Sequence, residues 1–187
     1  MRVGLVRHFK VICKPDSSWM TSEEFDQWVA DYNCSEIVPE RVFERDNCWQ
    51  ICLSSDLYRA SRTAELLYQG HVIACSQLRE ISMRSFMRAN WKLPHIIWIM
   101  MARLAWLFSH KSQEEGRVDT ALRAKQMVDL IESFGADNTL IVSHGAFMKA
   151  LSNELKRRGY SGKRFLKPEN GKLYTFEATF SATHGKS

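Results

Sequence analysis

The chain has 187 residues, of which 45% are hydrophobic, 11% aromatic and 25% charged. These proportions are ordinary for a globular protein, and they exclude intrinsic disorder, a collagen-like repeat and a disulfide-rich scaffold. Lys and Arg number 26 against 21 Asp and Glu, a formal charge of +5. That surplus favours anionic partners, which include both phosphorylated small molecules and nucleic acid.

The first half of the chain predicts alternating strands and helices, because short apolar runs alternate with stretches of helical periodicity. The expected elements are a strand at Val3–Val6, a helix beginning at Thr21–Phe25, a strand at Trp49–Leu53, a helix at Leu57–Tyr68 and a strand at Val72–Ala74. Residues 33–48 are polar and mixed, and no element is predicted for them.

The second half continues the same pattern after a segment rich in Trp and Met. The expected elements are that segment at about 84–111, a helix at 117–134, a strand at Thr139–Val142, a helix at Ala146–Arg158 and a strand at Leu173–Phe180. Gly159 is expected to end the helix before it. Because no repeat or linker divides the chain, we expect one α/β domain spanning 1–187 with a helical insertion.

Five cysteines, an odd number without the spacing of a zinc site, are expected to be free buried thiols in a reducing compartment. The apolar run Val3–Val6 is too short for a signal peptide, so a cytoplasmic protein is expected. Leu93–Phe108 resembles a membrane segment, but it contains Arg103 and is shorter than the ~18–20 residues that cross a bilayer. We expect it to be a buried helix with no membrane partner, the alternative being a lid or a partner surface.

Polar residues follow three of the predicted strands directly. Arg7 and His8 follow the first strand, Ser54–Arg59 the second, and Ser143–Gly145 the strand before the last helix. In an open α/β sheet the carboxyl ends of the strands form the ligand site, so these groups are expected to converge, together with Glu80. Arginine forks match phosphate oxygens and imidazole attacks phosphorus, which indicates a phosphate site. On chemistry alone either histidine could be the nucleophile.

Four segments in this order resemble the histidine phosphatase superfamily, which includes the cofactor-dependent phosphoglycerate mutases. They are Leu5–His8, Ser54–Ala64, Leu78–Glu80 and Val142–Gly145. The resemblance implies a three-layer α/β/α sandwich around a mixed, mostly parallel sheet of the phosphoglycerate mutase type.

The resemblance also implies roles for individual residues. His8 would be the nucleophile that becomes phosphohistidine, and Glu80 the proton donor. Arg7, Arg59 and His144 would bind the phosphoryl group, with His144 protonated so that three cations balance the phosphate dianion. No metal and no cofactor is expected.

The chain departs from the family pattern next to these residues. Phe9 stands where family members usually have Gly, and Lys10–Lys14 replace polar residues that commonly follow. The prediction is a metal-independent phosphomonoester hydrolase that acts on a phosphorylated small molecule. The alternatives are a phosphomutase and a catalytically weak module that binds phosphate or nucleic acid; a phosphoprotein substrate and a homodimer stay open.

Three further features of the sequence each allow two interpretations. Asp56 is the second choice for the proton donor, although its place suits a helix cap. The basic residues of 156–167 are expected to form a solvated helix end and not a nucleic-acid surface. Trp91, Trp98 and Trp106 of the insertion are expected to pack over the mouth of the site, the alternative being a plain extension of the core.

Overall fold

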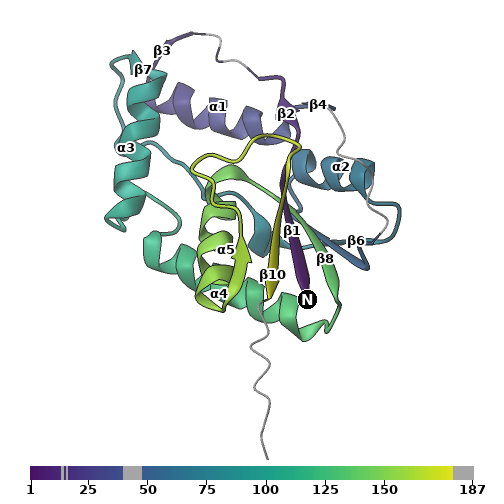
Figure 1. Cartoon of the computed structure of the whole chain (residues 1–187). Helices are drawn as coiled ribbons and strands as arrows, with labels where there is room; N and C mark the ends of the chain where they lie inside the picture. The colour runs from purple at the N-terminus through teal and green to yellow at the C-terminus, as the bar shows by residue number, and fades with distance from the viewer. Residues whose placement is uncertain (14, 16, 40–47, 179–187) are drawn as a thin grey trace, which may run out of the picture.

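A computed structural model describes residues 1–13, 15, 17–39 and 48–178 of the chain. Its centre is a six-stranded sheet with the strand order β6-β5-β8-β1-β10-β9 (Figure 1). The strands are β1 (Arg2–Arg7), β5 (Ile51–Ser54), β6 (Val72–Ala74), β8 (Asn138–Ser143), β9 (Tyr160–Gly162) and β10 (Leu173–Ala178). The first four in the order run parallel, whereas β10 is antiparallel to β1 and β9 is antiparallel to β10.

Helices cover both faces of this sheet, as the alternation of side chains along β1 requires. Val3 and Leu5 point to the face covered by α4 (Arg117–Ser133) and α5 (Gly145–Arg157), and they share one apolar cluster with those helices. Val6 lies on the opposite face, in a second cluster with α2 (Tyr58–Leu67). The predicted three-layer α/β/α sandwich is therefore confirmed.

The second face admits a bulky side chain because β1 has a glycine there. A Cβ atom built on Gly4 would lie only 2.5 Å from Cη2 of Trp49. Trp49 is buried and packs with the cluster on that face. Any larger residue at position 4 would push this indole out of the core.

A third cluster lies away from the sheet, between α1 (Ser22–Cys34) and α3 (His95–Leu107). Its buried members are Met20, Phe25, Ala89 and Trp98. The start of α1 is a capping box in which Thr21 and Glu24 each accept a backbone N–H of the other. Figure 1 shows α1 across the carboxyl end of β1, which makes this helix one wall of the site described below.

The expected strands and helices all occur, and their described bounds shift by at most two residues. The insertion contains a single helix, α3, and the last strand ends at Ala178, so the predicted end at Phe180 lies outside the described residues. Elements of two or three residues were not predicted: β9, the pair β2 (Lys10–Val11) and β4 (Ile37–Val38), and the pair β3 (Trp19–Met20) and β7 (Leu93–Pro94). They are too short for any periodicity to appear in the sequence.

Two expectations about burial are wrong. Cys34 is exposed, although none of the five cysteines forms a disulfide. The helix α3 is buried on one side only, since Ile96, Met100 and Leu104 on it are each more than half exposed. Within the described ranges, no helix is long and apolar enough to cross a membrane.

Candidate active site

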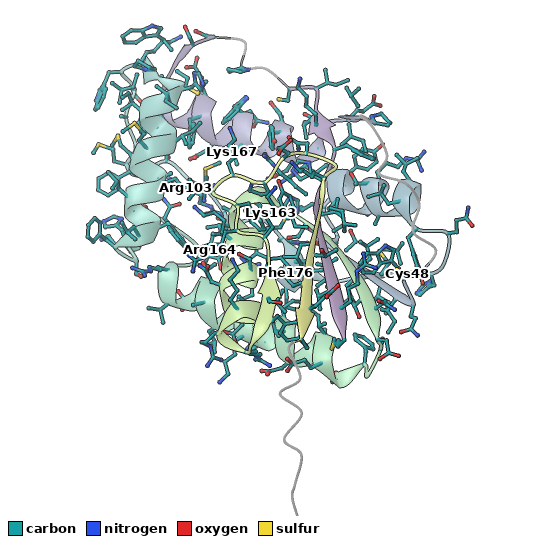
Figure 2. All side chains as sticks on the ribbon, in the orientation of Figure 1. Cys48, Arg103, Lys163, Arg164, Lys167 and Phe176 are labelled. Atoms are coloured by element: carbon teal, nitrogen blue, oxygen red, sulfur yellow. The ribbon has the colours of Figure 1, made fainter. Side chains whose placement is uncertain are left out.

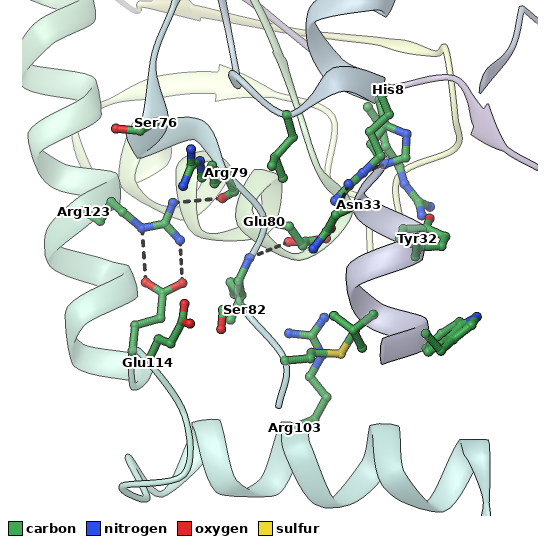
Figure 3. Close-up of a pocket in the computed structure, with 18 residues that line it drawn as sticks. His8, Tyr32, Asn33, Ser76, Arg79, Glu80, Ser82, Arg103, Glu114 and Arg123 are labelled. Carbon is green, nitrogen blue, oxygen red and sulfur yellow. Dashed lines mark hydrogen bonds and ion pairs between the residues drawn. The ribbon is translucent and has the colours of Figure 1, made fainter. Parts of the chain in front are cut away.

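Residues from separate elements meet beyond the carboxyl ends of β1, β5 and β8. Arg7 ends β1 and His8 follows it, while Arg59 lies in the first turn of α2 and Glu80 follows a short 3₁₀ helix, η1 (Ser76–Leu78). These four side chains line one cavity of about 540 Å³, shown in Figure 3. The ring of His144 lies behind it, 5.0 Å from the ring of His8 between centroids. The structure thus brings together every site residue that the sequence predicted.

The ring of His8 is held in one orientation and one tautomer. Its Nδ1 lies 2.6 Å from the carbonyl oxygen of Phe9. Because a carbonyl only accepts, Nδ1 is the nitrogen that carries the proton, and Nε2 has the free lone pair. Arg59 Nε donates to that Nε2 at 3.3 Å. Burial, then the charge of Arg59, lowers the pKa of His8 to about 3, so the ring is neutral at neutral pH.

Phe9, which replaces the glycine usual in the family, does not enter the cavity. Its side chain is fully buried in the cluster beneath α2. Its backbone N–H donates to Thr63 Oγ1 at 3.0 Å, while its carbonyl orients His8. The substitution therefore fills the core under the site and leaves the space in front of His8 open.

Arg7 is anchored by the loop that precedes β10. Its Nη1 donates to the carbonyl of Pro168 at 3.1 Å, and its own carbonyl accepts from the N–H of Gly171. Asn170 Nδ2 donates to the carbonyl of His8 at 2.7 Å, so the same loop also holds the next residue. Arg7 Nε is buried and has no hydrogen-bond partner in the described part of the chain. This unused donor at the cavity wall suits an anionic ligand.

Arg59 is oriented by α1. Its Nη1 donates to Asn33 Oδ1 at 2.9 Å, and its guanidinium lies over the ring of Tyr32, 5.2 Å from the centroid. Only 2% of the residue is exposed, although it lies in the first turn of a helix. Arg62, one turn further on, is half exposed and pairs with Glu65. Only the first of these two arginines reaches the cavity.

His144 is fully buried and does not line the cavity. Its Nε2 lies 2.9 Å from Ser55 Oγ, and its Nδ1 has no partner among the described residues. Burial, followed by the charge of Arg59, holds its pKa well below the usual value. This shift favours the neutral imidazole, whereas the sequence led us to expect a protonated one. A Cβ at the next residue, Gly145, would lie 3.3 Å from Arg7 Nε, so a larger residue there would require the Arg7 side chain to shift slightly.

Glu80 is fixed by backbone donors at the start of α5. Oε1 accepts from the N–H groups of Phe147 and Ile81, both at 3.0 Å, and Oε2 accepts from Ala146 at 3.2 Å. With a single longer hydrogen bond, Oε2 retains a lone pair that can carry a proton. Figure 3 shows the carboxylate on the same cavity wall as His8.

Arg123 of α4 fixes the segment that carries Glu80. Its guanidinium donates to the carbonyls of Gln77 and Arg79 and forms a two-point ion pair with Glu115, drawn as dashed lines in Figure 3. No sequence pattern predicted a role for this residue, for Asn33 or for Asn170. Each acts through contacts between elements far apart in the chain, which leave no local pattern.

Asp56, the second choice for the proton donor, does not line the cavity. Both of its oxygens accept from Arg79, at 2.7 and 2.6 Å, and this hydrogen bonding lowers the pKa of Asp56. The predicted cap is also wrong, because the N-cap of α2 is Leu57 and no side chain caps it.

The outer part of the cavity is mostly built by α1 and by the residues after Glu80. Its outer walls are formed by Trp28, Val29, Tyr32, Asn33, Ile81, Ser82 and Met83. From the insertion, Arg103 reaches the lining, and Figure 3 shows it rising from α3 into the space. The expected cover by tryptophans is not found: Trp91, Trp98 and Trp106 are absent from the lining. Trp98 instead packs against Phe25, and its Nε1 donates to the carbonyl of Met20.

The basic segment 156–167 divides into two parts. Arg158 binds the carboxylates of Glu154, Asp129 and Glu132, and Arg157 also binds Glu154. These ion pairs tie α5 to α4, so they form structural contacts within the fold. The exposed cations further along are on the loop between β9 and β10, where Figure 2 labels Lys163, Arg164 and Lys167.

The comparison with family models identifies the class of protein. The model of the histidine phosphatase superfamily, branch 1, matches residues 40–184. The chain therefore belongs to this superfamily. The matched range begins after Arg7 and His8, so the family model does not include the first strand. The solved structures below are superposed on more of the chain. No curated protein matches the sequence closely enough to count as a relative.

Solved structures share the fold at low sequence identity. The α-ribazole phosphatase of Shigella flexneri is 19% identical and superposes with a TM-score of 0.59, covering 94% of this chain and 89% of that one. A mycobacterial glucosyl-3-phosphoglycerate phosphatase in complex with VO3 is 20% identical, with a TM-score of 0.57 and 94% of both chains covered. A mutant phosphoserine phosphatase of Entamoeba histolytica, bound to phosphoserine, is 16% identical, with a TM-score of 0.55, covering 83% of this chain and 80% of that one. These likenesses confirm the phosphoglycerate mutase type of fold.

The buried neutral state of His8 predicts a loss of stability in acid. The unfolded chain takes up a proton near pH 6.5, whereas the folded protein does so only near 3. The stabilisation is thus complete above pH 6.5 and falls as the pH approaches 3, by up to about 1.4 kcal/mol per pH unit. Chemical denaturation without phosphate, between pH 7 and pH 5, should show a shallower decline for His8→Gln than for the wild type. Replacing the exposed His71 by Gln should leave the slope unchanged, and equal slopes in all three proteins would contradict a neutral His8.

Proposed function

We propose that the protein is a metal-independent phosphomonoester hydrolase that acts through a phosphohistidine at His8. The observation that carries this proposal is the oriented, neutral ring of His8, which lines a cavity together with Arg7 and Arg59 and whose Nε2 accepts a hydrogen bond from Arg59. A neutral imidazole is the nucleophilic form. Phosphoryl transfer requires positioning and positive charge around the equatorial oxygens, and the two guanidinium groups supply both.

In the first step, Nε2 of His8 attacks phosphorus and the bond from phosphorus to the ester oxygen breaks. Arg7 and Arg59 bind the phosphoryl oxygens, and the leaving oxygen takes a proton from Glu80. The carbonyl of Phe9 accepts the hydrogen bond from Nδ1–H throughout, which stabilises the positive charge that develops on the ring. His144, whose ring centroid lies 5.0 Å from that of His8, would bind a phosphoryl oxygen through Nδ1, which has no hydrogen-bond partner among the described residues.

In the second step, water attacks phosphorus and the P–N bond breaks. The carboxylate of Glu80 takes a proton from the water, so the group that was the acid in the first step is the base in the second. Inorganic phosphate leaves and His8 returns to its neutral form. Turnover in EDTA that is lost in His8→Ala would support this function, whereas transfer of the phosphoryl group to a second organic molecule would favour the phosphomutase.

The substrate class is a phosphorylated small molecule, since a cavity of about 540 Å³ holds a leaving group of that size. The similar structures are an α-ribazole phosphatase, a glucosyl-3-phosphoglycerate phosphatase and a phosphoserine phosphatase bound to phosphoserine, a phosphomonoester. A panel of phosphometabolites, scored by release of inorganic phosphate, identifies the preferred leaving group.

The role of Glu80 is tested through the leaving group. An alkoxide leaves poorly without a proton, and general acid catalysis contributes about 10²–10⁴-fold. Glu80→Gln should therefore slow hydrolysis of an alkyl phosphate by such a factor and slow that of p-nitrophenyl phosphate much less. Asp56→Asn is the control, because its carboxylate is bound to Arg79 outside the cavity. Equal slowing of both substrates by Glu80→Gln would reject Glu80 as the donor.

A further inference from the structure

One face of α3 is an apolar surface exposed to solvent. We call it the α3 face, and its members with their exposed fractions are Ile96 (51%), Ile97 (37%), Met100 (55%), Leu104 (52%), Leu107 (41%) and Phe108 (76%). At about 100° per residue these positions fall within one stripe of roughly 120° along the helix. Trp98, Ala102 and Ala105 on the opposite side are buried against the protein. Figure 2 shows side chains along α3 projecting away from the sheet.

The charged residues in the part of the sequence that contains α3 are all cations. Between residues 81 and 113 there is no Asp or Glu, while the cations are Arg84, Arg88, Lys92, Arg103 and Lys111. Two of them are neutralised by other elements, Arg84 by Glu114 and Lys92 by Glu24.

Two of the remaining cations flank α3 in the sequence, and the third lies at the cavity. Arg88, before α3, and Lys111, after it, are exposed and form no ion pair with any described residue. Arg103 lines the cavity of the candidate active site. Along the chain, the apolar stripe is therefore preceded and followed by an exposed cation that no described carboxylate pairs with.

We propose that the α3 face binds the anionic surface of a lipid bilayer. A helix with bulky apolar side chains on one side and flanking cations lies in the plane of the interface, with the apolar side chains among the acyl chains and the cations at the head groups. Trp91, which is 55% exposed just before α3, is a residue type enriched at that boundary. The 13 residues of α3 lie on the membrane and do not cross it.

A second copy of the chain fits the α3 face less well. In a two-fold dimer through the α3 face, the segments 81–113 of the two copies, which contain cations and no Asp or Glu, would lie together. Such a contact brings segments of like charge together. An anionic bilayer instead meets every flanking cation with opposite charge.

Binding is measured by flotation of the purified protein with vesicles of phosphatidylcholine alone or mixed with phosphatidylglycerol. The wild type should float with the mixed vesicles and much less with the neutral ones. Met100→Glu combined with Leu104→Glu should weaken partitioning by more than about tenfold, since two apolar anchors are lost. The matched control is Val118→Glu with Leu122→Glu on α4, two exposed apolar residues at the same spacing, which should float like the wild type.

The contribution of charge is tested separately. Arg88→Gln and Lys111→Gln should each weaken binding to the mixed vesicles by about fivefold. Circular dichroism melting shows whether each variant is folded, and light scattering gives its oligomeric state. Absence of wild-type binding to mixed vesicles would overturn the proposal. So would an equal loss in the α4 control, or a wild-type dimer that Met100→Glu with Leu104→Glu dissociates without any change in flotation. The result does not depend on catalytic activity.

Discussion

Replacing His8 by alanine is expected to reduce kcat for p-nitrophenyl phosphate by about 10⁴-fold or more, because the variant lacks the atom that attacks phosphorus in the proposed mechanism. In that mechanism Nε2 of His8 makes the attack, since Nδ1–H is engaged by the carbonyl of Phe9. The neighbouring His144 is not expected to replace it, because His144 is buried and does not line the cavity. Steady-state assays in EDTA measure the loss directly.

The control for His8→Ala is His71→Ala, at an exposed position in the loop before β6. It should retain wild-type kcat. Since His8 is buried, melting curves must show that His8→Ala is folded, and His8→Gln provides a variant of closer volume. Retention of more than a tenth of wild-type kcat in either folded His8 variant would contradict its role as the nucleophile.

The second large effect is expected at Arg59. Arg59→Ala should lower kcat/KM by a hundredfold or more, corresponding to about 3–4 kcal/mol of charge stabilisation in the transition state. The guanidinium is held by Asn33 and Tyr32 with its Nε directed at His8 Nε2, so it lies where the phosphoryl oxygens would bind. Arg59→Lys keeps the charge without the planar fork, and it should recover only part of the loss. Kinetics of all three proteins with one aryl phosphate give the comparison.

Arg62→Ala is the matched control for Arg59→Ala, because it removes the same side chain one turn along the same helix. Arg62 is half exposed, and its partner is Glu65. We expect less than a twofold change in kcat/KM, as for most exposed surface ion pairs. Similar losses at both positions would mean that the phosphate-binding arginine has been misidentified.

The sheet was predictable because its strands have a local signature. Val3–Val6 and Thr139–Val142 are apolar runs buried on both faces, and polar residues begin where each strand ends. That boundary also located His8 and Ser143–Gly145 at one edge of the sheet. The direction of the strands was therefore enough to predict that these site residues lie close together.

The protonation state and the contacts of each site residue could not be predicted from the sequence in this way. The pKa of His144 is lowered by burial, together with Arg59 and His8, and none of those contacts is local in sequence. Phe9 is a departure from the family pattern in the sequence, yet in the fold its side chain fills the core and its carbonyl orients His8.

The insertion was the least predictable segment. A helix that is apolar on most sides is usually buried, but α3 packs on one side only, against α1 through Trp98 and against α4 through Trp106. One of its sides is consequently exposed, and Trp98 packs inward with Phe25 and not over the cavity. Composition identifies an apolar helix, whereas the number of neighbouring elements decides how many of its sides are covered.

The most direct measurement is acid quench during turnover of a ³²P-labelled substrate, followed by mapping of the labelled residue. Nucleophilic attack by His8 predicts an adduct that is labile in acid, stable in base, and located at His8. The adduct should be absent from His8→Ala and should accumulate when Glu80→Gln slows hydrolysis of the intermediate. Label at His144, or at a serine or cysteine, would contradict the account.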